Sequence, residues 1–230
     1  MVIEKDHGRN KLTVFLEGLE GVALIIVCTL FWRILRYLLR NLGATQEESD
    51  KEWPGDALLD RADRIFTRAV EIDAAPENIW RWIVQIGRDK AGFYSYELIE
   101  NLAGFRVTNR ETILPEFQTL EEGEFISFHP NGQGVYVDTV KSNEFLVCRS
   151  WKDESEIEAK MPVSKGTWSL YIVKDGELKS RLSIRSCEET LRPGFLHVIV
   201  ILLFIDPIDF VMEYKMMRTI KRLAEGMERA

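Results

Sequence analysis

The sequence is poor in the residues and motifs that mark metal-bound, disulfide-bonded or nucleotide-dependent proteins. Its 230 residues include 3 cysteines and 3 histidines, with no CxxC pair and no Cys/His cluster. We therefore expect no zinc site, no disulfide framework and no cofactor. The nucleophile elbow, the Walker A loop, the Rossmann glycine motif and the zinc-protease helix motif are also absent, so the sequence shows no assembled catalytic machinery.

The chain also lacks a dense cationic block. Its formal net charge is −7, and 46% of its residues are hydrophobic and 29% are charged, which is an ordinary globular balance. Nucleic acids bind clustered cationic faces, so we expect no nucleic-acid partner. The three cysteines are widely spaced and odd in number, which favours a reducing compartment. We therefore expect a cytoplasmic protein.

The apolar run near the N-terminus is short. Gly21–Trp32 carries no charge but reaches only about 18 Å as a helix, against about 30 Å of bilayer hydrocarbon. Arg33, Arg36 and Arg40 follow at helical spacing and would line one face. We expect residues 14–39 to form an apolar helix. It would span a membrane, lie on the inner face of the cell membrane, or pack on the domain or on a second subunit.

A polar stretch separates this helix from the rest of the chain. Residues 43–56 contain Pro54-Gly55 and predict a linker. We therefore divide the chain into an apolar helix with its linker (1–50) and one main domain (51–230).

The main domain shows the periodicities of an α+β fold. Alternating residues predict a strand at 64–72, and Pro76 near a helix start precedes an apolar face ended by Gly87. Asp175-Gly176 predicts a hairpin. The remaining expected elements are a short helix at 96–102, strands at 124–128, 135–140, 145–151, 166–174 and 180–187, a charged loop at 152–160, and a long helix at 196–227. This order favours a curved antiparallel sheet wrapped round the C-terminal helix, with a cavity between them.

Three segments carry a resemblance to a known family. They are Ile72–Trp80 with its Ala-Pro turn, Val84–Glu97 with the sequence Gly-Phe-Tyr-Ser-Tyr, and the Asp-Pro-Ile-Asp start of the last helix at Asp206. Together they resemble the START-like superfamily (SRPBCC), within its polyketide cyclase/dehydrase-like group. The resemblance covers about residues 52–226 and implies the helix-grip fold with an internal ligand cavity. Many members of this subgroup have no assigned activity.

The Gly-Phe-Tyr-Ser-Tyr block supplies two candidate ligand-binding residues. Tyr94 and Tyr96 offer apolar rings with hydroxyl groups that can orient a ligand. The resemblance implies that this block lies near the mouth of the cavity. The alternative is a structural corner in which both rings fill the core.

Further candidates for the cavity lining are large or flexible apolar side chains. Aromatic rings on the first helix and on the strands can line a cavity, and methionines can adapt to a ligand. Packing in the core without a ligand is the alternative for each of them. These candidates are Trp80, Trp151, Trp168, Met212 and Met216.

The leading functional hypothesis is the binding of a hydrophobic small molecule, lipid-like or polyketide-like, in the internal cavity, with a membrane tether as an option. The alternative is an enzyme of the cyclase or dehydratase kind, and a third option is a regulatory partner protein without a ligand. An ionisable pair facing inward would favour the enzyme, an all-apolar cavity would favour binding, and a filled interior would favour the third option.

Overall fold

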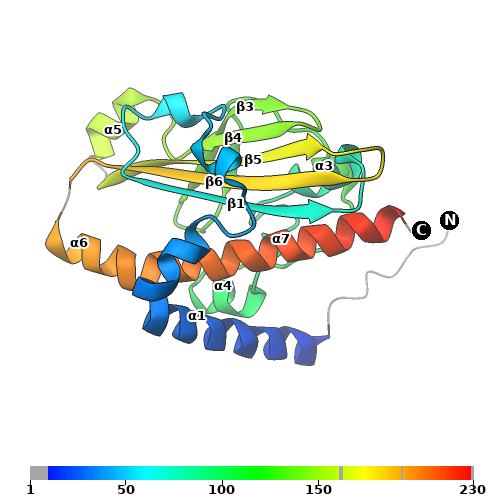
Figure 1. Cartoon of the computed structure of the whole chain (residues 1–230), viewed down its shortest axis with the longest axis horizontal. Helices are drawn as coiled ribbons and strands as arrows, with labels where there is room; N and C mark the ends of the chain where they lie inside the picture. Colours follow the sequence, from blue (N-terminus) through cyan, green and yellow to red (C-terminus); the bar gives the residue numbers. More distant parts are fainter. Residues whose placement is uncertain (1–9, 161–162, 193, 229–230) are drawn as a thin grey trace.

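The computed structural model describes residues 10–160, 163–192 and 194–228, without the side chains of residues 32–38, 159, 196–198 and 202–203. One antiparallel sheet of six strands, in the order β1-β6-β5-β4-β3-β2, lies along the long C-terminal helix (Figure 1). The strands are β1 (Arg64–Ile72), β2 (Phe125–Ser127), β3 (Gly134–Lys141), β4 (Phe145–Arg149), β5 (Ser164–Lys174) and β6 (Ser180–Thr190).

Two layers of helices lie on the concave side of the sheet, whereas α5 lies on the other side (Figure 1). The last helix, α7, packs between the sheet and the N-terminal helix α1 (Figure 1). The helical elements are α1 (Lys11–Arg40), α2 (Gln46–Asp50), η1 (Asp56–Leu58), α3 (Pro76–Ile83), α4 (Glu97–Leu102), η2 (Pro115–Phe117), α5 (Glu154–Lys160), α6 (Phe195–Val200), η3 (Ile201–Ile205) and α7 (Asp206–Glu228). This arrangement confirms the predicted helix-grip α+β fold.

Local sequence signals account for most of these elements. Pro76 opens α3, and the helix buries Ile79, Trp80 and Ile83 as its periodicity predicts. The Asp175-Gly176 turn joins β5 to β6, and Gly176 has a φ of 109°, which only glycine adopts freely. The expected final helix is present, but it consists of α6, the π-helical turn η3 and α7.

One local prediction was wrong. Residues 152–160, expected as a charged loop, contain the helix α5. The carboxylate of Asp153 accepts a hydrogen bond from the backbone N–H of Glu156 at 3.0 Å, which caps the first turn. Lys160 and Glu156, one turn apart, form an ion pair at 2.6 Å. Caps and pairs of this kind stabilise a short helix that carries almost no apolar periodicity.

The main core fills one half of the concave face of the sheet. Inward residues of β1, β4, β5 and β6 meet α3 and the C-terminal half of α7 there. The core includes Ile72, Trp80, Leu146, Leu170, Leu182, Ile184, Met216, Met217 and Ile220. Closely packed side chains occupy this half of the concave face.

The expected linker packs on the convex face of the sheet. Trp53 is buried against Tyr171, whose hydroxyl donates a hydrogen bond to the carbonyl oxygen of Pro54. Asp56 forms an ion pair with Arg185 of β6 at 2.8 Å. Glu48 also forms an ion pair with Arg181 of β6 at 2.5 Å, so residues on both sides of position 50 contact the sheet. The division into 1–50 and 51–230 stays a prediction.

The chain after α1 covers the edge strand of the sheet. The backbone N–H of Ala69 in β1 donates to the carbonyl oxygen of Leu42 at 3.1 Å, and the N–H of Thr67 donates to Asn41 Oδ1 at 3.4 Å. Unpaired edge strands attract other chains, so this segment protects β1 and also fixes where α1 leaves the body.

Candidate functional site

A cavity of about 400 Å³ lies between the concave face of the sheet and the N-terminal half of α7. Its walls come from β1, β3, β5, β6 and α7, together with residues next to β2 and β4. The lining residues are Arg64, Phe66, Arg68, Phe128, Val135, Ser150, Ser164, Gly166, Thr167, Trp168, Ser186, Cys187, Glu188, Asp209 and Glu213. The cavity is therefore mixed, with an aromatic wall and a cluster of charged groups.

Strand alternation turns the charged groups of β1 inward. Arg64 and Arg68 lie on the same face of the strand as Ile72, which is fully buried in the core. Opposite them, α7 presents Asp209 and Glu213, which stand four residues apart on one helical face. Arginines on the sheet thus face carboxylates on the helix.

Arg68 and Glu213 form the best-packed charge pair of the cavity. Arg68 Nη1 contacts Glu213 Oε2, and the two side chains are 3% and 14% exposed. Ser186 on β6 donates a hydrogen bond to Glu213 Oε1 at 3.0 Å. The guanidinium group also lies 5.2 Å from the ring centroids of both Phe66 and Phe210. These contacts leave this pair little freedom to reorient.

Arg64 joins two carboxylates at the far end of the cavity. Its Nη2 atom lies 2.6 Å from Asp206 Oδ1, and its Nη1 atom lies 3.0 Å from Glu188 Oε2. The Asp206 side chain has no exposed surface at all. One guanidinium therefore offsets the burial of two acids.

Asp209 differs from the other carboxylates of the cavity because it has no hydrogen-bond or ion-pair partner among the described residues. Within the part of the chain that the structure describes, its carboxylate makes no hydrogen bond and no ion pair, and its accessible surface faces the cavity. Asp209 keeps an exposed surface, yet desolvation by the surrounding protein raises its pKa to about 7, and the nearby carboxylate of Glu213 adds to the rise. The two arginines oppose it. Asp209 is thus a carboxyl group able to exchange a proton near neutral pH.

The opposite wall of the cavity is apolar. Trp168 on β5 and Phe128 meet edge to face, with ring centroids 5.9 Å apart, and Val135 lies beside them. Aromatic faces of this kind bind apolar bodies and also attract cations. The site can therefore hold a molecule that has both an apolar and a polar end.

The predicted tryptophan and methionine site residues fall in different places. Trp168 alone among them lines this cavity. Trp80 and Met216 lie in the main core, and Met212 packs under α1. Trp151 lies in a cluster with Leu59 and Cys187, on the convex side of the sheet. A ligand-binding role for these residues stays a prediction.

Neither tyrosine lines this cavity, since Tyr94 belongs to the main core and Tyr96 to the cluster beneath α1. Tyr94 is 1% exposed, and its hydroxyl accepts a hydrogen bond from Gln85 Nε2 at 2.7 Å. Its backbone has a φ of 57°, and its N–H donates to Asn109 Oδ1 at 2.8 Å. Tyr96 is equally buried and packs against α1 and Phe210. Their expected contact with a ligand also stays a prediction.

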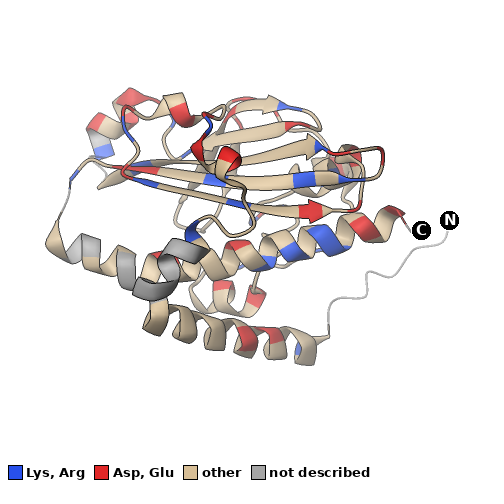
Figure 2. Cartoon of the chain, in the orientation of Figure 1, with Lys and Arg blue, Asp and Glu red and all other residues tan. Residues whose placement is uncertain are grey.

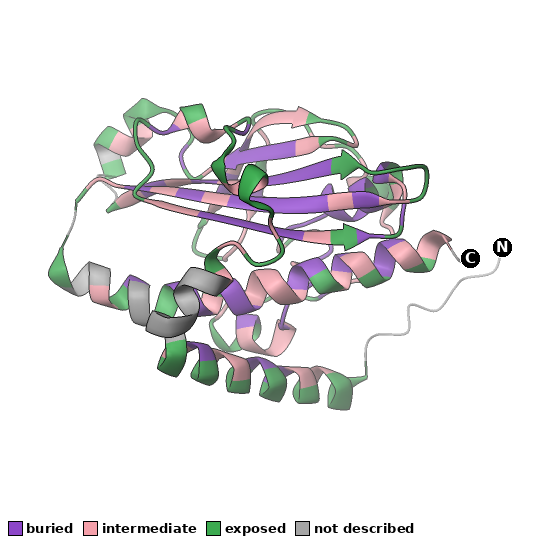
Figure 3. Ribbon diagram, viewed as in Figure 1, coloured by how far each residue is buried: buried purple, intermediate pink, exposed green. Residues whose placement is uncertain are grey.

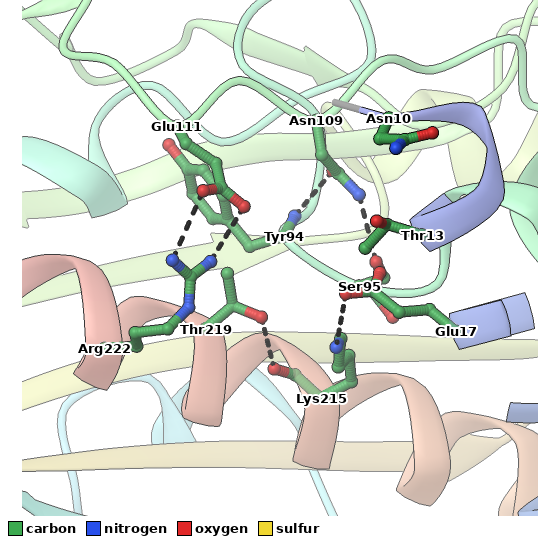
Figure 4. A pocket seen from close by; sticks show the side chains of 10 residues that line it. All are labelled: Asn10, Thr13, Glu17, Tyr94, Ser95, Asn109, Glu111, Lys215, Thr219 and Arg222. Atoms are coloured by element: carbon green, nitrogen blue, oxygen red, sulfur yellow. Dashed lines mark hydrogen bonds and ion pairs between the residues drawn. The ribbon is translucent and has the colours of Figure 1, made fainter. Parts of the chain in front are cut away.

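A second, polar pocket of about 320 Å³ lies between α1, α7 and the loop that carries Tyr94 (Figure 4). Its charged groups pair with one another across the gap. Arg222 Nη2 lies 2.8 Å from Glu111 Oε1, and Lys215 Nζ lies 3.3 Å from Glu17 Oε1 (Figure 4). These pairs tie α1 and the loop to α7, so we assign the pocket a structural role.

Sequence reasoning missed the charged residues of the cavity, although a signal for them was present. Arg64 and Arg68 share the alternation phase of the apolar residues of β1, and Glu213 lies in line with Met217 and Ile220 on α7. A charged side chain on the same face of a strand or helix as buried apolar residues must either be paired or line a cavity. Among the described residues, no group of His, Cys, Asp and Glu side chains is arranged to hold a metal ion.

Comparisons with known proteins find similarity in structure only. No family model matches the chain, and no curated protein matches it. Similar solved structures include truncated norcoclaurine synthase from Thalictrum flavum, with 14% identity over 70% of this chain and 92% of that chain, at a TM-score of 0.40. Another is CalC from Micromonospora echinospora, described as a self-sacrificing resistance protein, with 13% identity over 72% and 96% and a TM-score of 0.41.

A third is protein NE0264 from Nitrosomonas europaea, with 12% identity over 72% of this chain and 97% of that chain, at a TM-score of 0.41. Identities and scores of this size assign neither a ligand nor an activity. The fold assignment rests instead on the observed strand order and on the helix that fills the concave face. On these grounds, the helix-grip fold that the resemblance implied is confirmed.

Proposed function

We propose that the protein binds an amphipathic small molecule in the cavity between the sheet and α7. The observation that carries the proposal is the combination of one aromatic wall with one unpaired carboxyl group in the same cavity. Ligand sites of this size are typically apolar with a few polar groups that fix orientation. The apolar body would lie against Trp168 and Phe128, and its polar end would face Asp209.

The balance of charge favours a cationic end over an anionic one. Two arginines and three carboxylates line the cavity, and both arginines already contact carboxylates. An anion would have to displace one of those contacts, whereas a protonated amine would pair with Asp209 directly. The proposed ligand class is therefore a lipid-like or polyketide-like molecule that carries an amine or a neutral polar group.

Matched tryptophan variants test the site. Trp168→Ala removes a cavity wall, and Trp151→Ala removes a buried tryptophan from the other face of the sheet. We would titrate N-phenyl-1-naphthylamine, a neutral hydrophobic probe, into the parent and both variants. Trp168→Ala should weaken binding about tenfold, and Trp151→Ala should leave it within about twofold. Equal binding by all three proteins would contradict the proposal.

The charge preference needs a separate measurement. A long-chain alkyl amine and the alcohol of the same length would compete with the probe at pH values on both sides of 7. Since Asp209 ionises near pH 7, the amine should compete better as the pH rises, while the alcohol should not change. Asp209→Asn should remove the difference. An amine that binds independently of pH would refute the pairing with Asp209.

A second candidate function is acid–base catalysis in the same cavity. The specific observation is again Asp209, because a general acid or base works best when its pKa lies near the operating pH. In a cyclase or dehydratase, this carboxyl group would remove a proton beside a carbonyl group. Mass spectrometry would follow loss of water from an aromatic poly-β-carbonyl compound. Asp209→Asn should stop turnover but keep probe binding, and turnover that survives in the variant would reject this role.

The predicted cytoplasmic location and the attachment to the inner face of the cell membrane stay predictions of the sequence. They are independent of the cavity, because α1 lies on the far side of α7 from it (Figure 1).

A further inference from the structure

The outer face of α1 is a continuous apolar surface. Its large side chains recur three or four residues apart and remain exposed, while the edge of the helix that faces α7 is more buried (Figure 3). We call these residues the outer stripe: Leu12, Phe15, Leu16, Leu19, Val22, Ile26, Val27, Leu30 and Phe31. Contiguous apolar surface of this extent marks a site of interaction with a membrane or another protein.

The composition of α1 matches a membrane segment, but its packing does not match a spanning one. The segment Lys11–Phe31 is long and apolar enough to cross a membrane by length and composition, and only 17% of its most apolar stretch is buried in the protein. A core helix of a soluble domain would have most of this stretch buried. The exposed side is therefore available to a bilayer.

The inner face holds α1 flat against the body. A side chain at Gly18 would collide with Leu98, and a Cβ atom at Gly21 would stand 2.6 Å from Ile99 Cδ1. The two glycines thus allow close packing on α4. Glu17, on the same side, forms the ion pair with Lys215 of α7. Spanning a bilayer would break these contacts and take Glu17 into hydrocarbon.

The charges of α1 are arranged to suit an anionic surface. Among the described residues of α1, Glu17 is half-buried in a pocket formed with α7, and Glu20 is exposed where it borders another pocket against α7. Lys11 precedes the stripe, and the sequence places Arg33 in the same helix after it. Figure 2 shows the part of α1 that is not grey as mainly uncharged, with a few charged residues. Basic residues flanking an apolar stripe are typical of helices that lie in the interface of membranes with anionic lipids.

We propose that the outer stripe of α1 docks the protein on the surface of an anionic lipid bilayer, with the helix axis in the plane of the membrane. A bilayer fits the outer stripe better than a second copy of the chain would, because lipid tails adapt to a protruding helix, whereas a protein partner would need a matching groove. The rest of the domain would then stay on one side of the membrane, and α7 and the sheet would keep the arrangement seen in Figure 1.

Two leucine variants of the full-length protein test the docking. Leu19→Glu places a charge in the outer stripe, and Leu178→Glu is the matched control in the hairpin between β5 and β6. Both leucines are exposed, at 51% and 61%, so neither substitution disturbs the core. Vesicles of phosphatidylcholine mixed with phosphatidylglycerol would be sedimented with each protein. We expect Leu19→Glu to reduce the bound fraction at least about tenfold and Leu178→Glu to leave it unchanged.

Three results would overturn the proposal. One is sedimentation that does not differ between the parent and Leu19→Glu, or that is absent for the parent. Another is a parent protein that forms a dimer without vesicles, which Leu19→Glu dissociates, since a second copy would then cover the stripe. The third is resistance of the membrane-bound protein to alkaline carbonate extraction, which would show that α1 spans the bilayer. Tighter binding to the anionic vesicles than to pure phosphatidylcholine would support the role of the flanking basic residues.

Discussion

The buried pair of Arg68 and Glu213 allows a quantitative test of the cavity. Arg68→Met removes the charge but keeps an unbranched chain beside Phe66 and Phe210, the two rings that the guanidinium contacts. The Glu213 carboxylate then keeps only the hydroxyl of Ser186 as a hydrogen-bond donor. Breaking one partner of a buried pair costs about 3–5 kcal/mol. Because Glu213 borders a cavity that water can enter, we expect about 3 kcal/mol of lost unfolding free energy.

A double-mutant cycle isolates the interaction. Glu213→Leu alone removes the ion-pair partner of Arg68 and leaves it the carbonyl oxygen of Leu39 and the nearby carboxylate of Asp209. This change should cost a similar amount, whereas both changes together should bring stability back to within about 1 kcal/mol of the parent. Urea denaturation of the four proteins gives the coupling energy. The exposed pair of Arg61 and Asp63, 3.4 Å apart, is the matched control and should couple by less than about 0.5 kcal/mol. A coupling energy of Arg68 with Glu213 below about 1 kcal/mol would refute the buried pair.

Three further outcomes follow from buried groups. Trp80→Ala should lower the free energy of unfolding by about 3–5 kcal/mol in chemical denaturation, and a loss below about 1 kcal/mol would remove Trp80 from the core. Burial raises the pKa of Glu100 from 4.5 to about 8. The folded protein therefore keeps a proton that the unfolded chain releases, so stability should fall as pH rises from about 4.5 to about 8, and Glu100→Gln should flatten this slope. Tyr94→Phe should cost about 1 kcal/mol by removing the acceptor of Gln85 Nε2, and an unchanged melting temperature would place that hydroxyl in solvent.

Local patterns in the sequence were enough for the elements. The alternation in Arg64–Ile72 predicted β1 with its observed bounds, and the Asp175-Gly176 turn predicted the hairpin that joins the two longest strands. These features depend on side chains close together in the chain, because backbone alternation and turn geometry are local properties. The same locality explains the failure at α5, where a cap and an ion pair replaced the apolar periodicity on which the prediction relied.

The two faces of the sheet could not be assigned from the strands alone. Trp151 and Trp168 looked equivalent in the sequence, since both occur in strand-like runs of apolar residues. The structure places Trp168 in the cavity and Trp151 on the convex side. A shift of one residue in a strand moves a side chain to the other face, so the register of the whole sheet had to be known.

The sequence by itself determined the bounds of β1, the hairpin at Asp175-Gly176 and the apolar character of α1, because these follow from composition and local periodicity. Only the tertiary structure decided which charges meet. Arg68 and Glu213 lie 145 residues apart in the chain, yet they form one buried pair beside Asp209. Packing pairs or covers the neighbours of Asp209 and the inner side of α1. Which carboxyl group stays unpaired and which apolar side chains stay exposed therefore depends on the whole fold.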